Sequence, residues 1–293
     1  MKRTALLLLL LSFVSPTLAQ EKKEITANDV IDRIKKNVGL EWRGDTVDTF
    51  KGGDPSAKVT GIAVTMMATM DVLQRAAAKN ENLIITHEPT FFDHLDVSTQ
   101  LPQGDNDPIF AEKRAFIESH HLVVWRFHDY WHRRRPDGIL TGVIRKLDWE
   151  KYQDAANPYL FAIPETTVGQ LSEELKKKLG LSAMRVVADR DMKVKRLALS
   201  PGSAGFHREA GALEMPDVEL LIAGESREWE TVEYVADAIA QGRHKALILL
   251  SHVPSEQPGM DECTMWLKTF VKEVPVEFVP TKDPFAPLKP PQK

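Results

Sequence analysis

Four short clusters of histidine and acidic residues each follow an apolar, strand-like run of this sequence. The clusters hold His87 and Glu88, then His128, Asp129 and His132, then Glu225, and finally His252 and Glu256. α/β proteins usually build their sites in the loops that follow the carboxyl ends of strands. Imidazole and carboxylate groups that reach such loops from distant parts of one chain predict a metal centre. We expect a dinuclear centre with nitrogen and oxygen ligands and no thiolate, because the chain has a single cysteine.

The first two clusters each have a simpler interpretation that the residues alone leave open. His87 and Glu88 precede a proline, which favours an extended backbone, and consecutive side chains on an extended segment point to opposite sides. They could therefore serve two metal ions, although a lone histidine at a strand end is often only hydrogen-bonded. His128 and His132 are four residues apart, so a helix would place them on one face and a tight turn could also bring them together. The alternative is an aromatic-rich surface turn.

The last two clusters could also be parts of helix starts. Glu225 precedes an expected helix and could cap it, and Glu256 could be an acid of a first helical turn. Pro254 and Pro258 disfavour helical backbone at the residue before each of them. We therefore expect no continuous helix through both candidate ligands. On this interpretation His252 ends a strand, and Glu256 lies in the following loop or first helical turn.

Further motifs have weaker links to chemistry. The glycine-rich turn Ser200–Gly205 follows an expected strand and could hold an anion on its backbone N–H groups, but it lacks the lysine of a P-loop. Arg133–Arg135 could pair with an anionic substrate or only with solvent. His120 and His121 lie at an expected helix end, where a cation suits the helix dipole, so we assign them a structural role. Cys263 is expected to be a small core residue.

The N-terminal residues have the pattern of a secretory signal peptide. Lys2 and Arg3 precede a leucine-rich run over residues 5–14, and Thr17–Ala19 fits a cleavage site before Gln20. The alternative is an uncleaved N-terminus that anchors the chain. With cleavage, we expect a periplasmic or secreted protein, and no later segment is apolar enough to span a membrane. Removing 19 of the 293 residues leaves 274, enough for one large domain or two smaller ones.

The net charge and the pattern of apolar residues limit which folds and which binding partners are plausible. The net charge is only −4 and the basic residues form no large block, which argues against nucleic-acid binding. Alternation of strand and helix patterns predicts an α/β fold. We expect a signal peptide at 1–19, a first α/β lobe at 20–154, a second α/β lobe with the last metal motif at 155–280, and a proline-rich, extended tail at 281–293.

The same patterns predict the individual elements. Helices are expected at 26–39, 71–79, 110–120, 167–179, 230–240 and 263–271, and strands at 59–66, 83–86, 122–127, 159–163, 184–188, 194–199, 218–223, 246–250 and 276–279.

Together these motifs resemble the NIF-three-like family, also called the dinuclear metal-centre or "GTP cyclohydrolase I type 2-like" family, over roughly residues 25–280. The matching segments are 83–89, 123–132, 224–225 and 251–256, in the order that the family has them. The resemblance implies a two-lobed α/β subunit with the metal site between the lobes, often in a ring-shaped hexamer. The GTP cyclohydrolase label is not carried over, because GTP is scarce outside the cytoplasm.

Two positions depart from the family pattern in opposite directions. Glu88 stands where the family has the second histidine of its first motif, and His132 stands where it has an aspartate. The six matching positions therefore still hold four histidines and two carboxylates, and a site for two cations would keep its ligand charge. This compensation favours a retained, rearranged centre.

The leading interpretation is an exported, metal-dependent hydrolase that acts on an unknown small-molecule substrate with two divalent ions, which the ligand types suggest are zinc, manganese or iron. The expected ligands are His87, Glu88, His128, His132, His252 and Glu256. Asp129 and Glu225 are candidates for orienting a ligand or acting as a general base. The alternatives are a non-catalytic metal-binding or assembly protein and a substrate-capturing protein that uses Arg133–Arg135. The family implies self-association as a homo-oligomer such as a hexamer.

Overall fold

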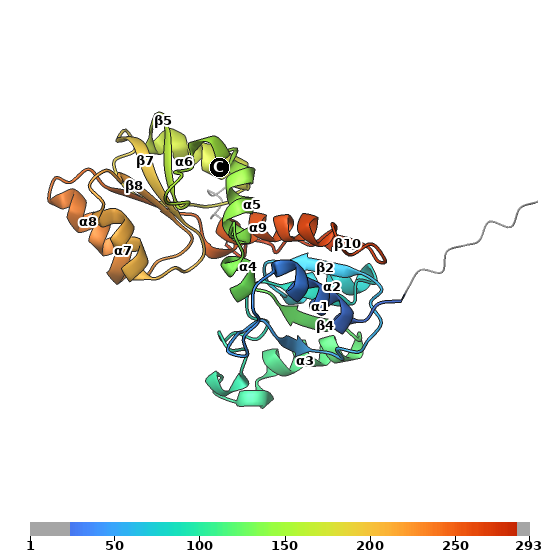
Figure 1. The fold of residues 1–293 in the computed structure, drawn as a ribbon. Coiled ribbons are helices and arrows are strands. Elements are labelled where there is room, and N and C mark those ends of the chain that lie inside the picture. Colours follow the sequence, from blue (N-terminus) through green and yellow to red (C-terminus); the bar gives the residue numbers. More distant parts are fainter. Residues whose placement is uncertain (1–23, 286–293) are drawn as a thin grey trace, which may run out of the picture.

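The computed structural model of the chain describes residues 24–285. The expected signal peptide at 1–19 and residues 286–293 of the tail lie outside this range. The described residues form two sheets, each with helices on its faces, and three further helices lie between the sheets at the centre of the molecule (Figure 1). None of the helices in this range is both long and apolar enough to cross a lipid bilayer. The predicted α/β class is confirmed.

The first sheet has the strand order β1–β4–β3–β2–β10. Its strands are β1 (Phe50–Gly52), β2 (Ile62–Thr65), β3 (Leu83–Thr86), β4 (Val123–Arg126) and β10 (Val276–Phe278). β10, β2, β3 and β4 run parallel, and β1 is an antiparallel edge strand. Parallel strands have both faces covered, which explains why β2, β3 and β4 are buried along their whole length. Two helices, α2 (Met70–Ala78) and α3 (Pro108–Ser119), share a hydrophobic cluster with one face, and α1 (Ala27–Val38) packs on the other.

The long connection between β3 and α3 carries two short 3₁₀ helices. These are η1 (Ser98–Gln100) and η2 (Gly104–Asn106). Apart from these two single turns, the connection from residue 87 to residue 107 forms no helix or strand.

The second sheet has the strand order β5–β7–β8–β9–β6. Its strands are β5 (Leu160–Thr167), β6 (Arg185–Val187), β7 (Lys193–Ser200), β8 (Leu220–Ala223) and β9 (Ala246–Leu249). The three central strands are parallel, and β5 and β6 are antiparallel edges. Helix α6 (Val168–Leu179) covers one face, while α7 (Phe206–Glu214) and α8 (Glu233–Ala240), which follows the π-helical turn η4 (Glu228–Val232), cover the other (Figure 1).

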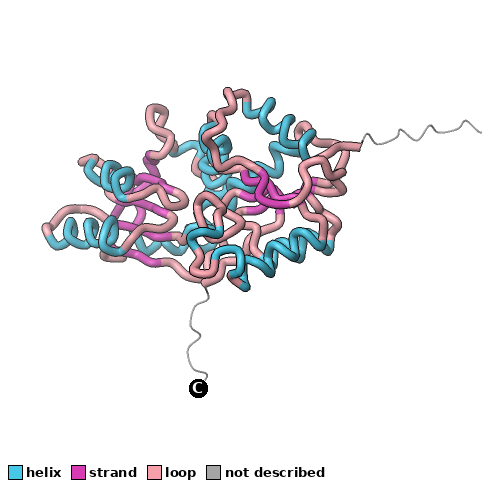
Figure 2. Tube along the Cα trace, turned by 90° about the horizontal axis from the view of Figure 1, so that it is seen from below, coloured by secondary structure: helices cyan, strands magenta, loops and turns pink. Residues whose placement is uncertain are grey.

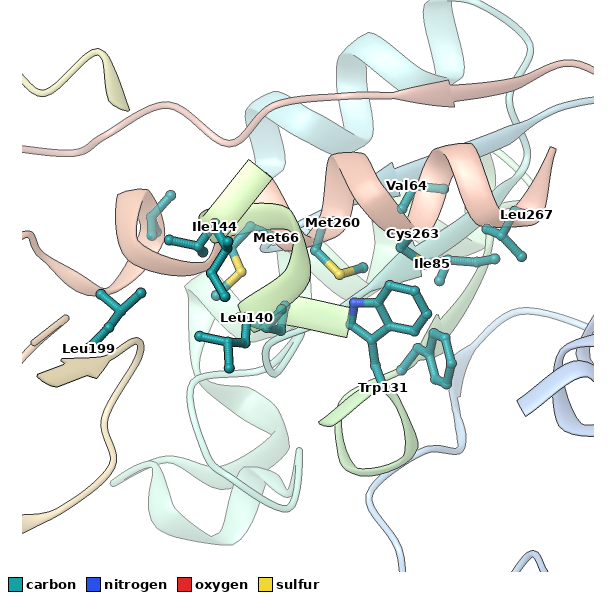
Figure 3. Packing of buried hydrophobic residues seen from close by; sticks show 14 of the residues in the cluster. Val64, Met66, Ile85, Trp131, Leu140, Ile144, Leu199, Met260, Cys263 and Leu267 are labelled. Atoms are coloured by element: carbon teal, nitrogen blue, oxygen red, sulfur yellow. The ribbon is translucent and has the colours of Figure 1, made fainter. Parts of the chain in front are cut away.

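Three helices lie at the junction of the two sheets. They are α4 (Asp129–Arg133), α5 (Gly138–Leu147) and α9 (His252–Leu267); the 3₁₀ turn η3 (Glu150–Tyr152) follows α5. Figure 3 shows side chains of α5 and α9 meeting side chains of both sheets, including Val64 and Ile85 of the first and Leu199 of the second. A single hydrophobic cluster therefore runs through both lobes, and the tube view in Figure 2 shows helices between the two sets of strands.

Local sequence signals explain several of the helix ends. Thr26 and Asp29 form a capping box at the start of α1, and Thr167 and Gln170 form one at the start of α6. Gly39 ends α1 in the left-handed conformation, as its position after the last apolar residue predicts.

Three expectations need correction. Residues 276–278 pair with β2 and so belong to the first sheet, although the sequence placed all of 155–280 in the second lobe. The tail is not free at its start, because Thr281 is buried and its backbone N–H donates to the side chain of Gln257 at 2.7 Å. Finally, α9 is a continuous helix from His252 through Glu256, which we did not expect.

The physical reason for the last correction lies in the position of the prolines. Pro254 occupies the first turn of α9, where a backbone N–H has no helical partner and proline costs little. Pro258 lies inside the helix and loses one backbone hydrogen bond. Helix α9 is nevertheless packed tightly, because its backbone at Pro258 and Gly259 touches α5 at Gly142, where an added Cβ would lie 2.2 Å from the Pro258 oxygen.

Candidate metal centre

The carboxyl edges of the two sheets meet, and they bring the candidate ligands together. His87 and Glu88 follow β3 and His128 follows β4, so the parallel strands deliver them to one edge. His132 comes from α4, and His252 and Glu256 come from the first turns of α9. The structure thus assembles all six predicted ligand residues at the junction of the lobes.

Two overlapping groups of these side chains could hold an ion. One atom each of His87, His128 and His132 lies within 4.8 Å of the others, and the same holds for His87, Glu88 and Glu256. His87 belongs to both groups. His252 completes the set, since its Nε2 lies 3.3 Å from Glu88 Oε1 and 3.0 Å from Glu256 Oε2.

The distances across the centre suit side chains that share a cation. His128 Nε2 lies 3.7 Å from Glu88 Oε1, and His132 Nε2 lies 3.8 Å from Glu256 Oε1. Two ligand atoms that bind the same ion, each at about 2.1 Å, are about 3.0–3.4 Å apart in octahedral or tetrahedral geometry. Movements of about half an ångström would therefore bring these groups to ligand spacing.

All four histidines present the same ring nitrogen to the centre. Their Nδ1 atoms face outer partners, and their Nε2 atoms face inward. The outer partners are the backbone oxygen of Phe127 for His87, Asp129 for His128, Asp137 for His132 and Glu225 for His252, at 3.0 to 3.2 Å. Ligating histidines usually donate their second ring N–H to a carboxylate or carbonyl in this way, which fixes the tautomer.

His87 gives the sharpest test of whether a cation fits. Its Nδ1 must donate, because the Phe127 oxygen can only accept, so Nε2 carries a lone pair. That Nε2 is buried and has no hydrogen-bond partner among residues 24–285. Burial, together with the positive charge of neighbouring imidazoles, lowers the pKa of His87 well below its ordinary value and keeps the ring neutral. A buried, unpaired lone pair of this kind is satisfied by a metal ion.

The acidic side chains of the centre also need a positive charge nearby to compensate their own. Burial opposes the charge on Glu88, but the hydrogen bond from His252 and nearby positive charges outweigh burial and hold the pKa of Glu88 below its ordinary value. Burial likewise opposes charge on His252, but hydrogen bonds with three surrounding carboxylates raise the pKa of His252 to about 12. Without a metal ion, the His252 imidazolium supplies the positive charge that these carboxylates require.

Asp129 and Glu225 occupy different environments. Asp129 accepts hydrogen bonds from the Thr46 hydroxyl at 2.8 Å and from the Val47 N–H at 3.3 Å, in addition to its contact with His128. These hydrogen bonds, led by that with His128, lower the pKa of Asp129. Glu225 lies 3.2 Å from His252 Nδ1 and also has a side-chain hydrogen bond with Ser203, and 52 % of its side chain is exposed.

Sequence reasoning missed several residues that support the centre. Asp137 orients His132, but before a helix it looks like an ordinary N-cap, and it is that as well. Asp48 accepts the backbone N–H groups of residues 128–130 and so fixes the turn of His128; nothing in the sequence marks it. Arg126 is fully buried at the end of β4, and its Nη2 lies 3.6 Å from Glu88 Oε2. The His94 ring stands 6.2 Å from that of His128.

Two motifs from the sequence have new roles in the structure. In Arg133–Arg135, Arg135 donates to the carbonyls that end α4, Arg134 lies over two tryptophan rings and Arg133 lies over the Tyr130 ring, so all three guanidinium groups have contacts within the chain. In Ser200–Gly205, an added Cβ at Gly202 would lie 2.3 Å from Glu256 Oε1. The glycine-rich turn therefore lies directly against the centre, where a side chain would displace a candidate ligand.

Comparison with known proteins agrees with this architecture. The family model described as Duf34/NIF3 (NGG1p interacting factor 3) matches residues 25–284. The chain belongs to the Duf34/NIF3 family. The match covers both sheets, the junction helices and every candidate ligand.

Several bacterial proteins are distant relatives of this chain in sequence or in structure. A "GTP cyclohydrolase 1 type 2 homolog" of Clostridium acetobutylicum is 27% identical over 221 residues, which are 71% of this chain and 76% of that protein. A protein of the same name from Clostridium perfringens is 23% identical over 273 residues, covering 88% of this chain and 98% of its own. The crystal structure of a Bacillus cereus protein related to NIF3 superimposes with a TM-score of 0.70 at 13% identity, covering 91% of this chain and 100% of that one. The Duf34/NIF3 fold is thus shared with proteins of very different sequence.

Proposed function

We propose that this Duf34/NIF3 protein is a metal-dependent hydrolase whose two divalent ions, zinc, manganese or iron, are held by His87, Glu88, His128, His132, His252 and Glu256. The observation that carries the proposal is the common orientation of the four histidines. Each turns Nε2 toward the buried carboxylates and fixes Nδ1 on an outer partner. Structural histidines have no reason to share this arrangement, whereas ligands to common ions do.

The residues around the centre divide into those that hold ions and those that move protons. Divalent ions, when bound, supply Lewis acidity and lower the pKa of a water molecule. Asp129 and Asp137 hold the imidazoles of His128 and His132 in the ligating tautomer. Both carboxylates are occupied by several donors, so we assign them positioning roles.

Glu225 is the candidate for proton transfer. Its carboxylate is half exposed at the edge of the centre, 3.2 Å from His252 Nδ1, and has a further hydrogen bond with the Ser203 side chain. A general base needs access to the substrate side, and the Glu225 side chain, 52 % exposed, meets this condition better than that of Asp129, which is 22 % exposed.

Chromogenic ester hydrolysis tests the proposal. The metal-reconstituted full chain is assayed with p-nitrophenyl phosphate, bis-p-nitrophenyl phosphate and p-nitrophenyl acetate. We expect turnover that falls about 100-fold or more in Glu225→Gln, which retains its metal, because removing a general base costs this much. Turnover no higher than that of a metal-depleted His252→Ala variant on all three esters would leave a non-catalytic metal-binding or assembly protein as the better account.

We also propose that the protein is exported and self-associates. The basic and apolar pattern of residues 1–19 supports export. Large apolar side chains of the segment between β3 and α3, and of the first turn of α3, are exposed, which supports burial against another copy: Phe92, Leu95, Val97 and Ile109. Cell fractionation tests export, and light scattering of Leu95→Glu against the wild type tests assembly.

A further inference from the structure

A cavity of about 440 Å³ lies beside the metal centre, between β5, β7 and α7 of the second lobe. Its walls are mainly apolar and include Leu160, Leu199, Met215 and Leu221. None of the six candidate metal ligands lines it. The volume is within the range of sites that bind small organic molecules.

Two polar side chains of this cavity could bind a ligand: the Ser200 hydroxyl has no hydrogen-bond partner, and the Arg208 guanidinium has no anionic partner among the described residues. Ser200, at the end of β7, is only 5% exposed, and its hydroxyl has no hydrogen-bond partner anywhere in residues 24–285. Arg208, on α7, lies with its guanidinium 4.2 Å from the centre of the Tyr159 ring and has a hydrogen bond with the Tyr159 side chain, but it forms no salt bridge with any of the described residues. A buried unpaired hydroxyl costs free energy unless a ligand or water satisfies it, and a guanidinium on an aromatic face can bind an anion in two-point geometry.

Tyr159 connects the cavity to the metal centre. Its ring lines the cavity, and its hydroxyl donates to Asp137 Oδ2 at 3.1 Å. The same oxygen lies 3.1 Å from His132 Nδ1. Two hydrogen bonds therefore separate a group bound over Tyr159 from a candidate metal ligand.

We propose that this cavity is a binding site for a small organic anion with a compact apolar body. The anionic group, a phosphate or a carboxylate, pairs with Arg208 and reaches the Ser200 hydroxyl, and the apolar body packs against Leu199, Met215 and Leu221. The site is separate from the metal ions, and its occupancy changes the hydrogen bond that holds His132. The inference concerns binding and stands whether or not the protein is a hydrolase.

Isothermal titration calorimetry with phenyl phosphate and with benzoate tests the inference on the zinc-reconstituted full chain. Arg208→Gln should weaken binding of both probes about tenfold or more, because a charge-assisted hydrogen bond is lost. Gly211→Leu should also weaken it, since Gly211 lines the cavity and an added Cβ there meets no atom within 4 Å, so the larger side chain fills space without a clash.

Two controls separate this site from the metal ions and from general charge. Arg243→Gln removes an arginine from a different cavity of the same lobe, lined by residues of α7 and α8, and should leave both affinities within about twofold. His252→Ala, which depletes the metal centre, should likewise retain probe binding. Binding that is lost in His252→Ala but kept in Arg208→Gln and Gly211→Leu would show that the probes bind only the metal ions, and the inference would be overturned. Failure of both probes to bind the wild type would overturn it too.

Discussion

At the scale of single residues, the centre depends on side chains that no ligand motif contains. Arg126 is fully buried, and its Nε donates to the His87 carbonyl at 3.1 Å. Its Nη1 lies 3.5 Å from Asp96 and its Nη2 lies 3.6 Å from Glu88. Arg126 therefore supplies the fixed positive charge behind the acidic ligand that departs from the family pattern.

Replacing Arg126 by methionine should destabilise the fold by about 3–5 kcal/mol, because the buried carboxylates of Glu88 and Asp96 each lose one positively charged neighbour. Arg114→Met is the matched control: its ion pair with Glu118 is exposed, and its loss should cost about 0–1 kcal/mol. Urea denaturation measures both changes. Similar losses in the two variants would mean that the buried cluster is not paired as described.

The exchanged ligands Glu88 and His132 should behave as a coupled pair. Glu88→His removes one of two carboxylates at the centre, so it should weaken binding of the second metal ion. Adding His132→Asp should recover much of that loss, because it restores the charge. Metal titration of the single variants and the double variant measures the coupling. Strictly additive losses would exclude one of the two residues from the centre.

Glu81 gives a pH dependence that is independent of the metal centre. Burial, and then the charge of Glu277, raise the pKa of Glu81 to about 7, with Lys79 opposing. The folded state therefore holds a proton that the unfolded state releases above its ordinary value of 4.5. The stabilisation is complete below about pH 4.5 and is lost as pH rises through about 7.

Glu81→Gln should remove this loss of folding stability at high pH, because glutamine does not ionise. The variant should be more stable than the wild type above pH 7 by on the order of 2 kcal/mol. The control is Glu112→Gln, at an exposed position of α3. Thermal unfolding between pH 5 and pH 8 measures the difference. A wild type and a Glu81→Gln variant with parallel pH profiles would contradict the assignment.

At the scale of elements, apolar runs were enough to predict the parallel strands, because both faces of β2, β3 and β4 are buried. Apolar runs were not enough to predict α5, α7 or the first turns of α9. Helix α5 is mostly buried, and its two fully exposed residues, Arg145 and Lys146, both lie in its last turn, so its sequence shows little of the polar face that reveals a surface helix. The start of α9 was hidden by prolines whose cost depends on where the helix begins.

The contact between α5 and α9 can be tested with two helix glycines. An added Cβ at Gly142 would clash with the backbone of α9, whereas one at Gly211 would meet open space. Gly142→Ala should destabilise the protein by about 1–3 kcal/mol and weaken metal binding, since α9 carries His252 and Glu256. Gly211→Ala should stabilise it by about 0.5–1 kcal/mol through helix propensity. Equal effects in chemical denaturation would contradict the close packing of the two helices.

At the scale of the whole molecule, the centre belongs to neither lobe alone. The first sheet contributes His87, Glu88 and His128, and the element after the second sheet contributes His252 and Glu256. The sequence indicated which residues would converge, because each motif follows a strand. It could not indicate the orienting roles of Asp137 and Arg126, which depend on how distant segments pack.

Because the ligands come from both lobes, metal ions should stabilise the entire fold. Saturation at about 100 times the dissociation constant adds about 2.7 kcal/mol, so removal by a chelator should lower the Tm by about 5 °C or more. Differential scanning calorimetry with and without chelator measures this shift. The chelator should lower the Tm of His252→Ala much less. A wild-type Tm that is the same with and without chelator would argue against ions at the junction.

The central claim is that the convergent histidines and carboxylates hold metal ions, and elemental analysis of the purified full chain tests it most directly. We expect up to two equivalents of zinc, manganese or iron in the wild type, the same content in His121→Ala, and a clear loss in His252→Ala. His121 lies just beyond the end of α3, away from the centre, so its variant controls for general damage. A wild type without metal, even after reconstitution with zinc or manganese, or equal metal content in the two variants, would contradict the account.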